Sequence, residues 1–123
     1  MDEATALVVE DDEIQRSVAA VLLEDENIHV IQCDSAEAAT AVLERVGKDL
    51  CMVFTDVNLS GEMTGAELAA VANDRFPGIK IIVTSGKEKP RLPPGATFLS
   101  KPWRSHELLH EALKACPHRP DHF

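Results

Sequence analysis

Four short apolar runs in the chain each end directly in a polar side chain that can take part in chemistry. They are LVV before Glu10 and Asp11, CMVF before Thr55 and Asp56, IIV before Thr84, and TFL before Ser100 and Lys101. Short, continuous apolar runs are typical of strands in a buried parallel sheet. Because ligands of an open α/β sheet bind beyond the carboxyl ends of its strands, we expect these polar side chains to lie together at one edge.

The segments between these runs have the apolar spacing of amphipathic helices, and this alternation predicts an α/β fold with a parallel sheet. Strands are predicted at residues 7–9, 29–33, 51–55, 80–84 and 96–99. Helices are expected to begin at four capping positions, which are Asp12, Asp34 or Ser35, Thr64, and Ser105.

Each predicted helix carries apolar residues whose spacing places them on one face. The four sets are Ile14, Val18, Val21 and Leu22; Ala38, Ala41 and Val42; Leu68, Val71, Ala72 and Phe76; and Leu109, Ala112, Leu113 and Cys116. The set on the third helix is predicted to be the buried face of that helix.

One stretch lacks this helical spacing. The segment SGKEKPRLPPG, residues 85–95, contains three prolines and two glycines between the fourth and fifth strands. Pro93 and Pro94 are incompatible with a continuous helix, because proline lacks a backbone N–H and its ring clashes with the preceding turn. The fourth helix of the alternation is therefore predicted to be replaced by a proline-rich loop.

The length of the chain, 123 residues, suits a single domain with a core over about residues 5–116 and a tail over 117–123. Its formal net charge of −9 argues against binding to nucleic acid or to an anionic membrane surface. No apolar stretch approaches the length of a membrane-spanning helix, and no basic region precedes the first apolar run as it does in a signal peptide. These features predict a cytoplasmic protein.

The three cysteines, Cys33, Cys51 and Cys116, are far apart in the sequence and form no C-x-x-C motif. An odd number of cysteines in an acidic chain without a secretion signal is typical of free thiols. We therefore expect three buried or half-buried thiols.

The acidic side chains predict a cation site. Glu10, Asp11 and Asp56 would repel one another in a single pocket unless a cation lay among them. Mg²⁺ meets this need, because it prefers oxygen ligands and commonly uses one or two carboxylates together with substrate phosphate. Asp11, Asp56 and the backbone carbonyl of Asn58 are the expected direct ligands, with Glu10 reaching the ion through water. Taken alone, the acidic run at 10–13 could instead be a negative helix N-terminus, which the helix dipole favours.

The same edge suits phosphoryl transfer. Aspartate is an established covalent phosphoryl acceptor, and Asp56 is the carboxylate expected to play this part. The Lys101 ammonium and the Thr84 hydroxyl can bind phosphoryl oxygens, because such catalysis rests mostly on positioning and electrostatics. Each residue alone has an ordinary explanation as a turn, cap or surface residue, and it is their order at successive strand ends that indicates a site.

The motifs LVVEDDE, VFTDVNLSG, IIVTSG and FLSKPW, in this order, resemble the signature of the receiver domain of two-component response regulators. The resemblance covers about residues 5–116. It implies a flavodoxin-like, doubly wound sheet of five parallel strands in the order 2-1-3-4-5. It also implies phosphorylation of Asp56 by a histidine kinase or a histidine phosphotransfer protein, with Mg²⁺ as the cofactor.

The resemblance assigns roles to further residues. Thr84 corresponds to the switch hydroxyl and Lys101 to the phosphate-binding lysine. Phe98 falls on the switch aromatic position, which is often Tyr in the family, so a ring hydroxyl is absent here. A cis peptide bond is implied between Lys101 and Pro102.

We expect a phosphoaccepting signalling domain of a bacterial two-component system rather than a conventional enzyme. It would act by contact with a downstream protein, as a monomer or a weak dimer. In the family the first helix, here with Ile14 and Arg16, meets the kinase, and the fourth helix contributes to the surface that reports phosphorylation. The short interval between residues 84 and 101 departs from that pattern and is expected to alter this surface.

Three alternatives remain open. Residues 106–110 read H-E-L-L-H, a spacing that in zinc hydrolases gives two histidine ligands, here His106 and His110, with Glu107 as the general base. A phosphatase with an aspartate nucleophile would need an acid two residues after it, where this chain has Asn58, and an amide cannot protonate a leaving group. A phosphorylation-independent docking module of the same fold is the third. Dependence on Mg²⁺ or on Zn²⁺ distinguishes the receiver from the hydrolase.

Overall fold

The computed structural model describes residues 4–116, and the predicted tail over 117–123 lies outside the described residues. Five parallel strands form one sheet in the order β2-β1-β3-β4-β5, which confirms the flavodoxin-like order that the resemblance implied. The strands are β1 (Thr5–Val9), β2 (His29–Cys33), β3 (Met52–Asp56), β4 (Lys80–Ser85) and β5 (Thr97–Ser100). The ends of each strand lie within two residues of the predicted positions.

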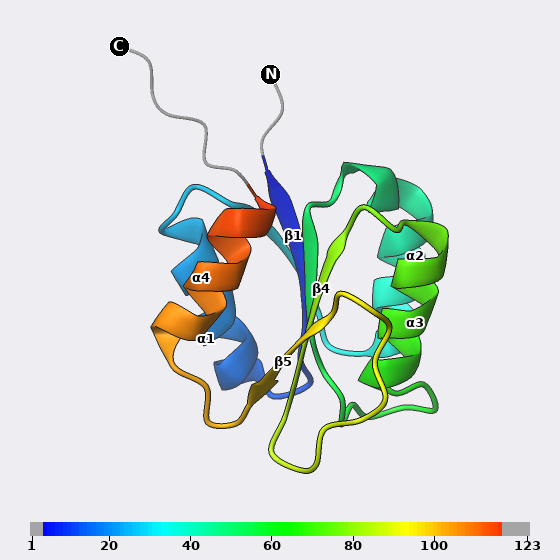
Figure 1. Cartoon of the computed structure of the whole chain (residues 1–123). Helices are drawn as coiled ribbons and strands as arrows, with labels where there is room; N and C mark the ends of the chain where they lie inside the picture. Colours follow the sequence, from blue (N-terminus) through cyan, green and yellow to red (C-terminus); the bar gives the residue numbers. More distant parts are fainter. Residues whose placement is uncertain (1–3, 117–123) are drawn as a thin grey trace.

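Helices cover both faces of the sheet, with α1 and α4 on one face and α2 and α3 on the other (Figure 1). They are α1 (Glu13–Glu24), α2 (Ala36–Val46), α3 (Gly65–Arg75) and α4 (Ser105–Ala115), with a short 3₁₀ turn, η1 (Gly47–Asp49), after α2. The connection from β4 to β5, residues 86–96, contains no helix, so the predicted loss of a helix there is confirmed. No helix in the described part of the chain is long and apolar enough to cross a membrane.

Both faces of the sheet are apolar. In β1, Ala6 and Val8 belong to the cluster that α1 and α4 cover, and Leu7 and Val9 belong to the cluster that α2 and α3 cover. All four side chains are at most 1% exposed. Successive strand residues point to opposite faces, so a strand covered on both sides reads as a continuous apolar run. Polar side chains that do chemistry are therefore confined to the strand ends.

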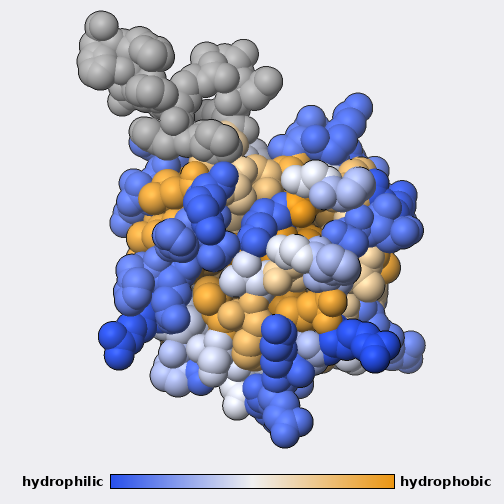
Figure 2. All heavy atoms as spheres, in the orientation of Figure 1, coloured by the Kyte–Doolittle hydropathy of each residue, from blue (hydrophilic) through white to orange (hydrophobic). Residues whose placement is uncertain are grey.

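The loop that replaces a helix leaves apolar side chains half-buried at the β5 edge of the sheet. Leu92, Ala96 and Phe98 pack against the cluster under α2 and α3 but remain partly accessible. Figure 2 shows hydrophobic atoms at the surface over β5 and the loop before it. This edge thus presents apolar side chains to solvent instead of the polar outer face that a surface helix has.

Side chains cap the first three helices as the sequence predicts. The Asp12 carboxylate accepts a hydrogen bond from the backbone N–H of Gln15 at 2.9 Å. Ser35 caps α2 through a hydrogen bond of 3.1 Å from the backbone N–H three residues later. Thr64 and Glu67 form a reciprocal capping box, in which each side chain accepts a hydrogen bond from the backbone N–H of the other, at 3.1 Å and 2.8 Å.

The prediction that Ser105 caps the last helix is wrong by one residue. Arg104 has the extended backbone of a cap, with φ −98° and ψ 151°, and Ser105 is already helical. The Glu107 carboxylate accepts a hydrogen bond from the Arg104 backbone N–H at 2.7 Å. This contact satisfies a free N–H at the start of the helix without a hydroxyl cap.

Three of the four residues in the apolar stripe predicted on α1 face solvent, and the fourth, Leu22, is half-buried against the core. Ile14, Val18 and Val21 are 76%, 49% and 53% exposed. The side chains of α1 that are buried against the sheet are Ala19, Ala20 and Leu23. Both sets satisfy the helical period, so spacing alone does not say which one faces the sheet. The small alanines allow close packing of α1 on the sheet and leave the larger stripe outside.

The apolar set noted on α2 is not the face that the fold buries, although Val42 is half-buried against the core. Ala38 and Ala41 are exposed, and the buried residues are Ala36, Ala39 and Leu43, one position along the helix. A one-residue shift in a helix turns the buried face by about 100°. The alanine-rich sequence of α2 contains apolar residues in both positions, so the pattern alone could not separate them.

The predicted faces of α3 and α4 are correct in part. In α3, Leu68 and Ala72 are buried as expected, while Val71 and Phe76 are half-buried. In α4, Leu113 is 39% exposed although it shares the spacing of its buried neighbours. The buried face of each helix is therefore narrower than its apolar pattern.

Cys51 and Cys116 form a disulfide, so the prediction of three thiols is wrong for these two, whereas Cys33 is free and buried. Cys51 immediately precedes β3 and Cys116 immediately follows α4. Their Cα atoms lie 5.3 Å apart although 65 residues separate them in the sequence. The fold sets this distance, and cysteine spacing along the chain carries no information about it.

Candidate functional site

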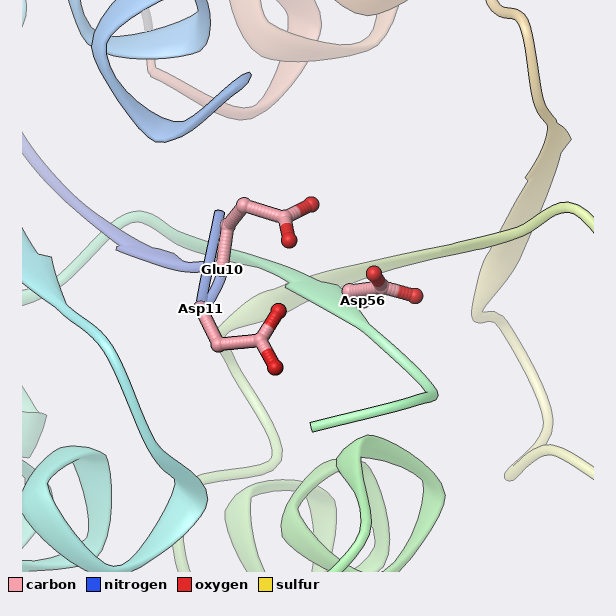
Figure 3. A group of neighbouring side chains, drawn as sticks. All are labelled: Glu10, Asp11 and Asp56. Carbon is pink, nitrogen blue, oxygen red and sulfur yellow. The ribbon is translucent and has the colours of Figure 1, made fainter. Parts of the chain in front are cut away.

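Three carboxylates meet at the carboxyl ends of two neighbouring strands (Figure 3). Glu10 and Asp11 follow β1 and Asp56 ends β3, so the parallel pairing of these strands brings them together. One oxygen atom from each carboxylate lies within 4.8 Å of the others. Glu10 and Asp56 are 7% and 6% exposed, and Asp11 is exposed. The structure therefore places at one edge the three acids that the sequence predicted there.

Lys101 places its ammonium group among these acids. It follows β5 directly, and its backbone N–H donates to the carbonyl of Ser85 at 2.9 Å, which holds it beside the end of β4. Its Nζ lies 2.8 Å from Asp56 Oδ2 and 3.1 Å from Glu10 Oε1. The peptide bond to Pro102 is cis, as the resemblance implied. The nearly buried carboxylate of Asp56 thus has a cationic partner.

Gln15 belongs to the site, although the sequence indicated only a capping role for it. Its backbone N–H meets Asp12, but its side-chain Oε1 accepts a hydrogen bond from Lys101 Nζ at 2.8 Å. The only signal in the sequence is its place in the first turn of the helix that follows the acidic pair. The first turn of α1 therefore helps to hold the lysine.

Burial and charge shift the pKa values of two groups in the site. Burial raises the pKa of Glu10, although hydrogen bonds from the Asp12 backbone N–H and from Lys101 oppose this effect. Burial by itself lowers the pKa of Lys101, but hydrogen bonds to Asp56 and Glu10 outweigh it and raise that pKa. Lys101 is therefore a cation at neutral pH. The negative charge of Glu10 is costly, and a further cation beside it would favour the ionised form.

Thr84 places an unpaired hydroxyl beside Asp56. The two residues are aligned in the pairing of β3 with β4, and Thr84 is 2% exposed. Within residues 4–116 its Oγ1 has no hydrogen-bond partner. Leaving a buried hydroxyl unsatisfied costs about 1–3 kcal/mol. A group with oxygen acceptors that bound at Asp56 would supply the missing partner.

Asn58 and Ser85 connect the loops that follow β3 and β4. The Asn58 backbone N–H donates to Asp56 Oδ1 at 3.1 Å, and its side-chain Nδ2 donates to Ser85 Oγ at 3.3 Å. Ser85 Oγ also accepts a hydrogen bond from the backbone N–H of Lys87 at 3.0 Å. Asn58 therefore fixes one oxygen of the Asp56 carboxylate, and the Ser85 hydroxyl joins the two loops.

The loop between β3 and α3 is held from two sides. The Ser60 backbone N–H donates to Asp11 Oδ2 at 3.2 Å, and Glu37 Oε2 accepts hydrogen bonds from the N–H groups of residues 62–63 at 3.1 Å and 3.0 Å. Hydrogen bonds from its own backbone N–H and from residues 62–63 lower the pKa of Glu37. Gly61 has φ +103°, and a Cβ there would lie 2.8 Å from Glu37 Oε1. Nothing in the local sequence around Glu37 marked this role.

The start of α3 meets the end of β3 where only glycine fits. The Gly65 backbone N–H donates to the carbonyl of Val57 at 2.9 Å. A Cβ on Gly65 would overlap the backbone carbonyl of Asp56 and would lie 2.9 Å from the Cα of Val57. The position of Asp56 therefore depends on direct contact between two backbone segments.

Phe98, the predicted switch aromatic, lies apart from this polar group. It is aligned with Val83 in the pairing of β4 with β5 and packs, half-buried, against the cluster under α2 and α3. Thr84, rather than Phe98, is the residue of this pair of strands that adjoins Asp56.

The histidines of the H-E-L-L-H motif are exposed on α4. His106 and His110 both face solvent, and the Glu107 carboxylate is hydrogen-bonded to a backbone N–H at the start of the helix. Over the described range 4–116, the only group of three candidate metal ligands is the acidic cluster, which contains neither histidine. The structure thus brings no third ligand to this pair from the described residues.

Comparison with protein families gives one match. The family model for the response regulator receiver domain matches residues 6–114. This range contains the acidic cluster, Thr84 and Lys101. No curated protein matches the chain.

Several solved structures share the fold. A CheY-like response regulator receiver domain protein from Methanospirillum hungatei JF-1 is 25% identical, with a TM-score of 0.82 over 92% of this chain and 93% of that chain. The receiver domain from the hybrid histidine kinase CckA is 27% identical, with a TM-score of 0.80 over 92% and 99% of the two chains. A response regulator receiver protein from Sinorhizobium medicae WSM419 is 24% identical and supports the fold alone, with a TM-score of 0.86 over 96% and 98%.

Proposed function

The chain belongs to the response regulator receiver domains of two-component systems, and we propose that it accepts a phosphoryl group on Asp56. The observation that carries the proposal is the environment of the Asp56 carboxylate. It is 6% exposed, and one of its oxygens lies 2.8 Å from Lys101 Nζ. The carboxylates of Glu10 and Asp11 each have an oxygen within 4.8 Å of an Asp56 oxygen. This arrangement combines a nucleophile, a cation for phosphoryl oxygens and a set of metal ligands in one place.

The proposed reaction is a displacement at phosphorus. A carboxylate oxygen of Asp56 bonds to phosphorus as the bond from phosphorus to the imidazole nitrogen of a phosphohistidine breaks, and the imidazole takes up a proton. The Lys101 ammonium binds one phosphoryl oxygen, and the Thr84 hydroxyl donates to another. The second contact would satisfy an oxygen that has no partner among the described residues. Movement of Thr84 toward the phosphoryl group, with Phe98 following, is the proposed switch.

The acidic cluster fits a magnesium ion. Its oxygens lie within 4.8 Å of one another and are the hard ligands that Mg²⁺ prefers. Asp11, Asp56 and the backbone carbonyl of Asn58 would hold the ion, with Glu10 acting through water. When bound, the ion supplies positive charge that reduces the repulsion among the acids and offsets the charge of the phosphoryl oxygens.

Phosphorylation by a small donor tests the proposal. The protein is incubated with acetyl phosphate and either Mg²⁺ or EDTA, and its intact mass is followed with time. We expect a single phosphoryl adduct that forms at least about tenfold more slowly in EDTA, because the negative charges at the site are then poorly balanced.

Three other outcomes would count against parts of the proposal. Equal labelling in Mg²⁺ and in EDTA would contradict the metal site. No labelling, together with no binding of beryllofluoride, would favour the phosphorylation-independent docking module. Hydrolytic activity that requires Zn²⁺ would point instead to His106, Glu107 and His110.

We infer that the phosphodonor protein contacts α1. A groove of about 470 Å³ lies beside the site and is lined by Ile14, Gln15, Val18, Lys101, Pro102, Trp103 and Ser105. Ile14 and Val18 are exposed apolar residues of α1, and Lys101 connects the groove to Asp56. Apolar side chains in a groove beside the acceptor suit the docking of an amphipathic helix, as a histidine phosphotransfer protein would present.

Two matched substitutions on α1 test this contact. Val18 lines the groove, whereas Val21 is similarly exposed on the same helix but does not. We expect Val18→Glu to slow transfer from a phosphorylated histidine phosphotransfer protein at least about tenfold, relative to labelling of the same variant by acetyl phosphate. For Val21→Glu we expect a change below about threefold. Equal effects of the two substitutions would contradict docking in the groove.

A further inference from the structure

The disulfide between Cys51 and Cys116 fastens the end of α4 to the sheet. The backbone N–H of Cys51 donates to the carbonyl of Thr5 at 2.9 Å, and its carbonyl accepts from the N–H of Lys80 at 3.1 Å. Cys116 ends α4, where its N–H donates to the carbonyl of Ala112 at 2.7 Å. A covalent bond therefore joins a residue held between β1 and β4 to the last turn of a helix.

β3 and the segment that leads into α4 also meet at their other ends, in the candidate site. β3 runs from just after Cys51 to Asp56, and Lys101 lies shortly before α4. Lys101 Nζ and Asp56 Oδ2 form an ion pair of 2.8 Å. The segment 101–116 is therefore joined to β3 twice, by the disulfide at one end and by the ion pair at the other.

We propose that Cys51 and Cys116 are a reversible redox modification site that exchanges with a small thiol–disulfide couple of the glutathione class. The two cysteines differ in exposure, because Cys116 is fully buried and Cys51 is half-buried. An attacking thiolate can therefore reach the sulfur of Cys51 but not that of Cys116. Cys33 is buried on the other face of the sheet and takes no part.

Reduction consumes two small thiols and releases one small disulfide. The thiolate of the first attacks Cys51 Sγ, the bond between the two cysteines breaks, and Cys116 leaves as a thiolate that takes up a proton. The thiolate of the second attacks the small-molecule sulfur of the mixed disulfide and frees Cys51, which is then protonated. Two electrons pass from the small thiols to the protein. Oxidation by a small disulfide is the same sequence in reverse.

The reduced protein keeps α4 on the sheet by packing and by the polar contacts of Glu111 with β4 and β5. Leu108 and Ala112 are fully buried in the core cluster under α1 and α4, so the helix remains docked without the covalent bond. Its last turn is then free to open more often, because local opening is governed by the contacts that remain. Trp103 lies between Lys101 and α4, with its ring edge-to-face against Phe54 at 5.4 Å between centroids, and it reports on this segment.

Redox titration with hydrogen exchange tests the proposal. The wild-type protein is equilibrated in mixtures of reduced and oxidised glutathione, approached from both directions, then quenched in acid and alkylated after denaturation. We expect the number of alkylated cysteines to change reversibly between three and one, with Cys33 always alkylated. In the reduced state we expect amide exchange over residues 105–116 to be at least about tenfold faster, and the melting temperature to be about 10 °C lower.

Control variants separate the site from general effects of thiols. Cys33→Ser retains the pair and should titrate at the same glutathione ratio, with a count that changes between two and none, whereas Cys51→Ser should show the fast exchange of α4 in every mixture. Three alkylated cysteines under oxidising conditions would overturn the proposal. A count of one that persists in reduced glutathione would also overturn it, since the bond would then be a fixed structural link. Identical amide exchange over residues 105–116 in the oxidised and the reduced protein would overturn it as well. None of these measurements involves phosphoryl transfer, so they are independent of the proposed function.

Discussion

Replacing Asp56 with Asn is expected to abolish the phosphoryl adduct completely, because an amide does not form an acyl phosphate. The change conserves the shape of the side chain. An Asn at this position can still accept the hydrogen bond that Asn58 donates at 3.1 Å. The amide nitrogen then stands in the place of Oδ2 and cannot accept a hydrogen bond from Lys101 Nζ, so the contact of 2.8 Å is lost, while Lys101 keeps Glu10 and Gln15 as partners. We expect the fold to be retained while the nucleophile is lost. Intact mass after incubation with acetyl phosphate and Mg²⁺ measures the result.

Asp12→Asn is the matched control for this prediction. Asp12 carries the same side chain next to the acidic pair but lies outside the acidic cluster. Asn is as good a helix cap as Asp, so the hydrogen bond from the Gln15 N–H should persist. We expect its labelling rate to stay within about twofold of wild type. Wild-type labelling of Asp56→Asn would show that another residue accepts the phosphoryl group and would remove the basis of the assignment.

The second large effect is expected for Gly65→Ala, which should destabilise the protein by about 3 kcal/mol or more. The added Cβ would overlap the carbonyl of Asp56, and backbone cannot move aside as the end of a flexible side chain can. Either α3 or the end of β3 has to shift. Because the carbonyl in question belongs to Asp56, we also expect slower phosphoryl labelling of any variant protein that remains folded.

Urea unfolding followed by the fluorescence of Trp103 measures the loss of stability. Gly78→Ala serves as the control, because a Cβ at Gly78 would have no neighbour within 4 Å. That substitution should change the free energy of unfolding by less than about 0.5 kcal/mol. If Gly65→Ala unfolded at the same urea concentration as wild type, the backbone contact between α3 and β3 would not be the constraint described above.

The acidic edge of the sheet could be predicted from the sequence because each strand end has a strong local signal. An apolar run that stops at a charged residue fixes both the strand and the point where it ends. Parallel strands end on the same side, so Glu10, Asp11, Asp56 and Lys101 had to lie near one another once the strands were recognised. The prolines of residues 86–96 gave an equally local signal, because proline excludes a regular helix.

The rotation of the helices could not be predicted in the same way. In α1, the stripe of Ile14 and Val18 and the stripe of Ala19 and Leu23 both recur with the helical period. The larger side chains gave the stronger pattern, but the smaller ones are the residues that fit against the sheet. Which stripe is buried depends on packing against the sheet, which hydrophobic periodicity does not describe.

Two contacts between distant parts of the chain were not predicted. Gln15 and Lys101 are 86 residues apart, and Cys51 and Cys116 are 65 residues apart. Neither pair has a sequence motif, because their proximity follows from the order of the strands and the path of the helices. They can be recognised only after the fold has placed them together.

The bond between Cys51 and Cys116 also determines how the chain responds to mechanical force. Tension applied at its two ends passes from one cysteine to the other through the bond, so the residues between them carry no load. The disulfide shields the chain between the two cysteines, a separation of 65 residues, from the applied force. At roughly 3.4 Å for each residue, the oxidised chain therefore extends by about 220 Å less than the reduced one. β1 and β2 can be drawn out straight, while β3, β4 and β5 stay within a closed loop. An unfoldase that threads a single polypeptide chain would meet two chains side by side at the disulfide.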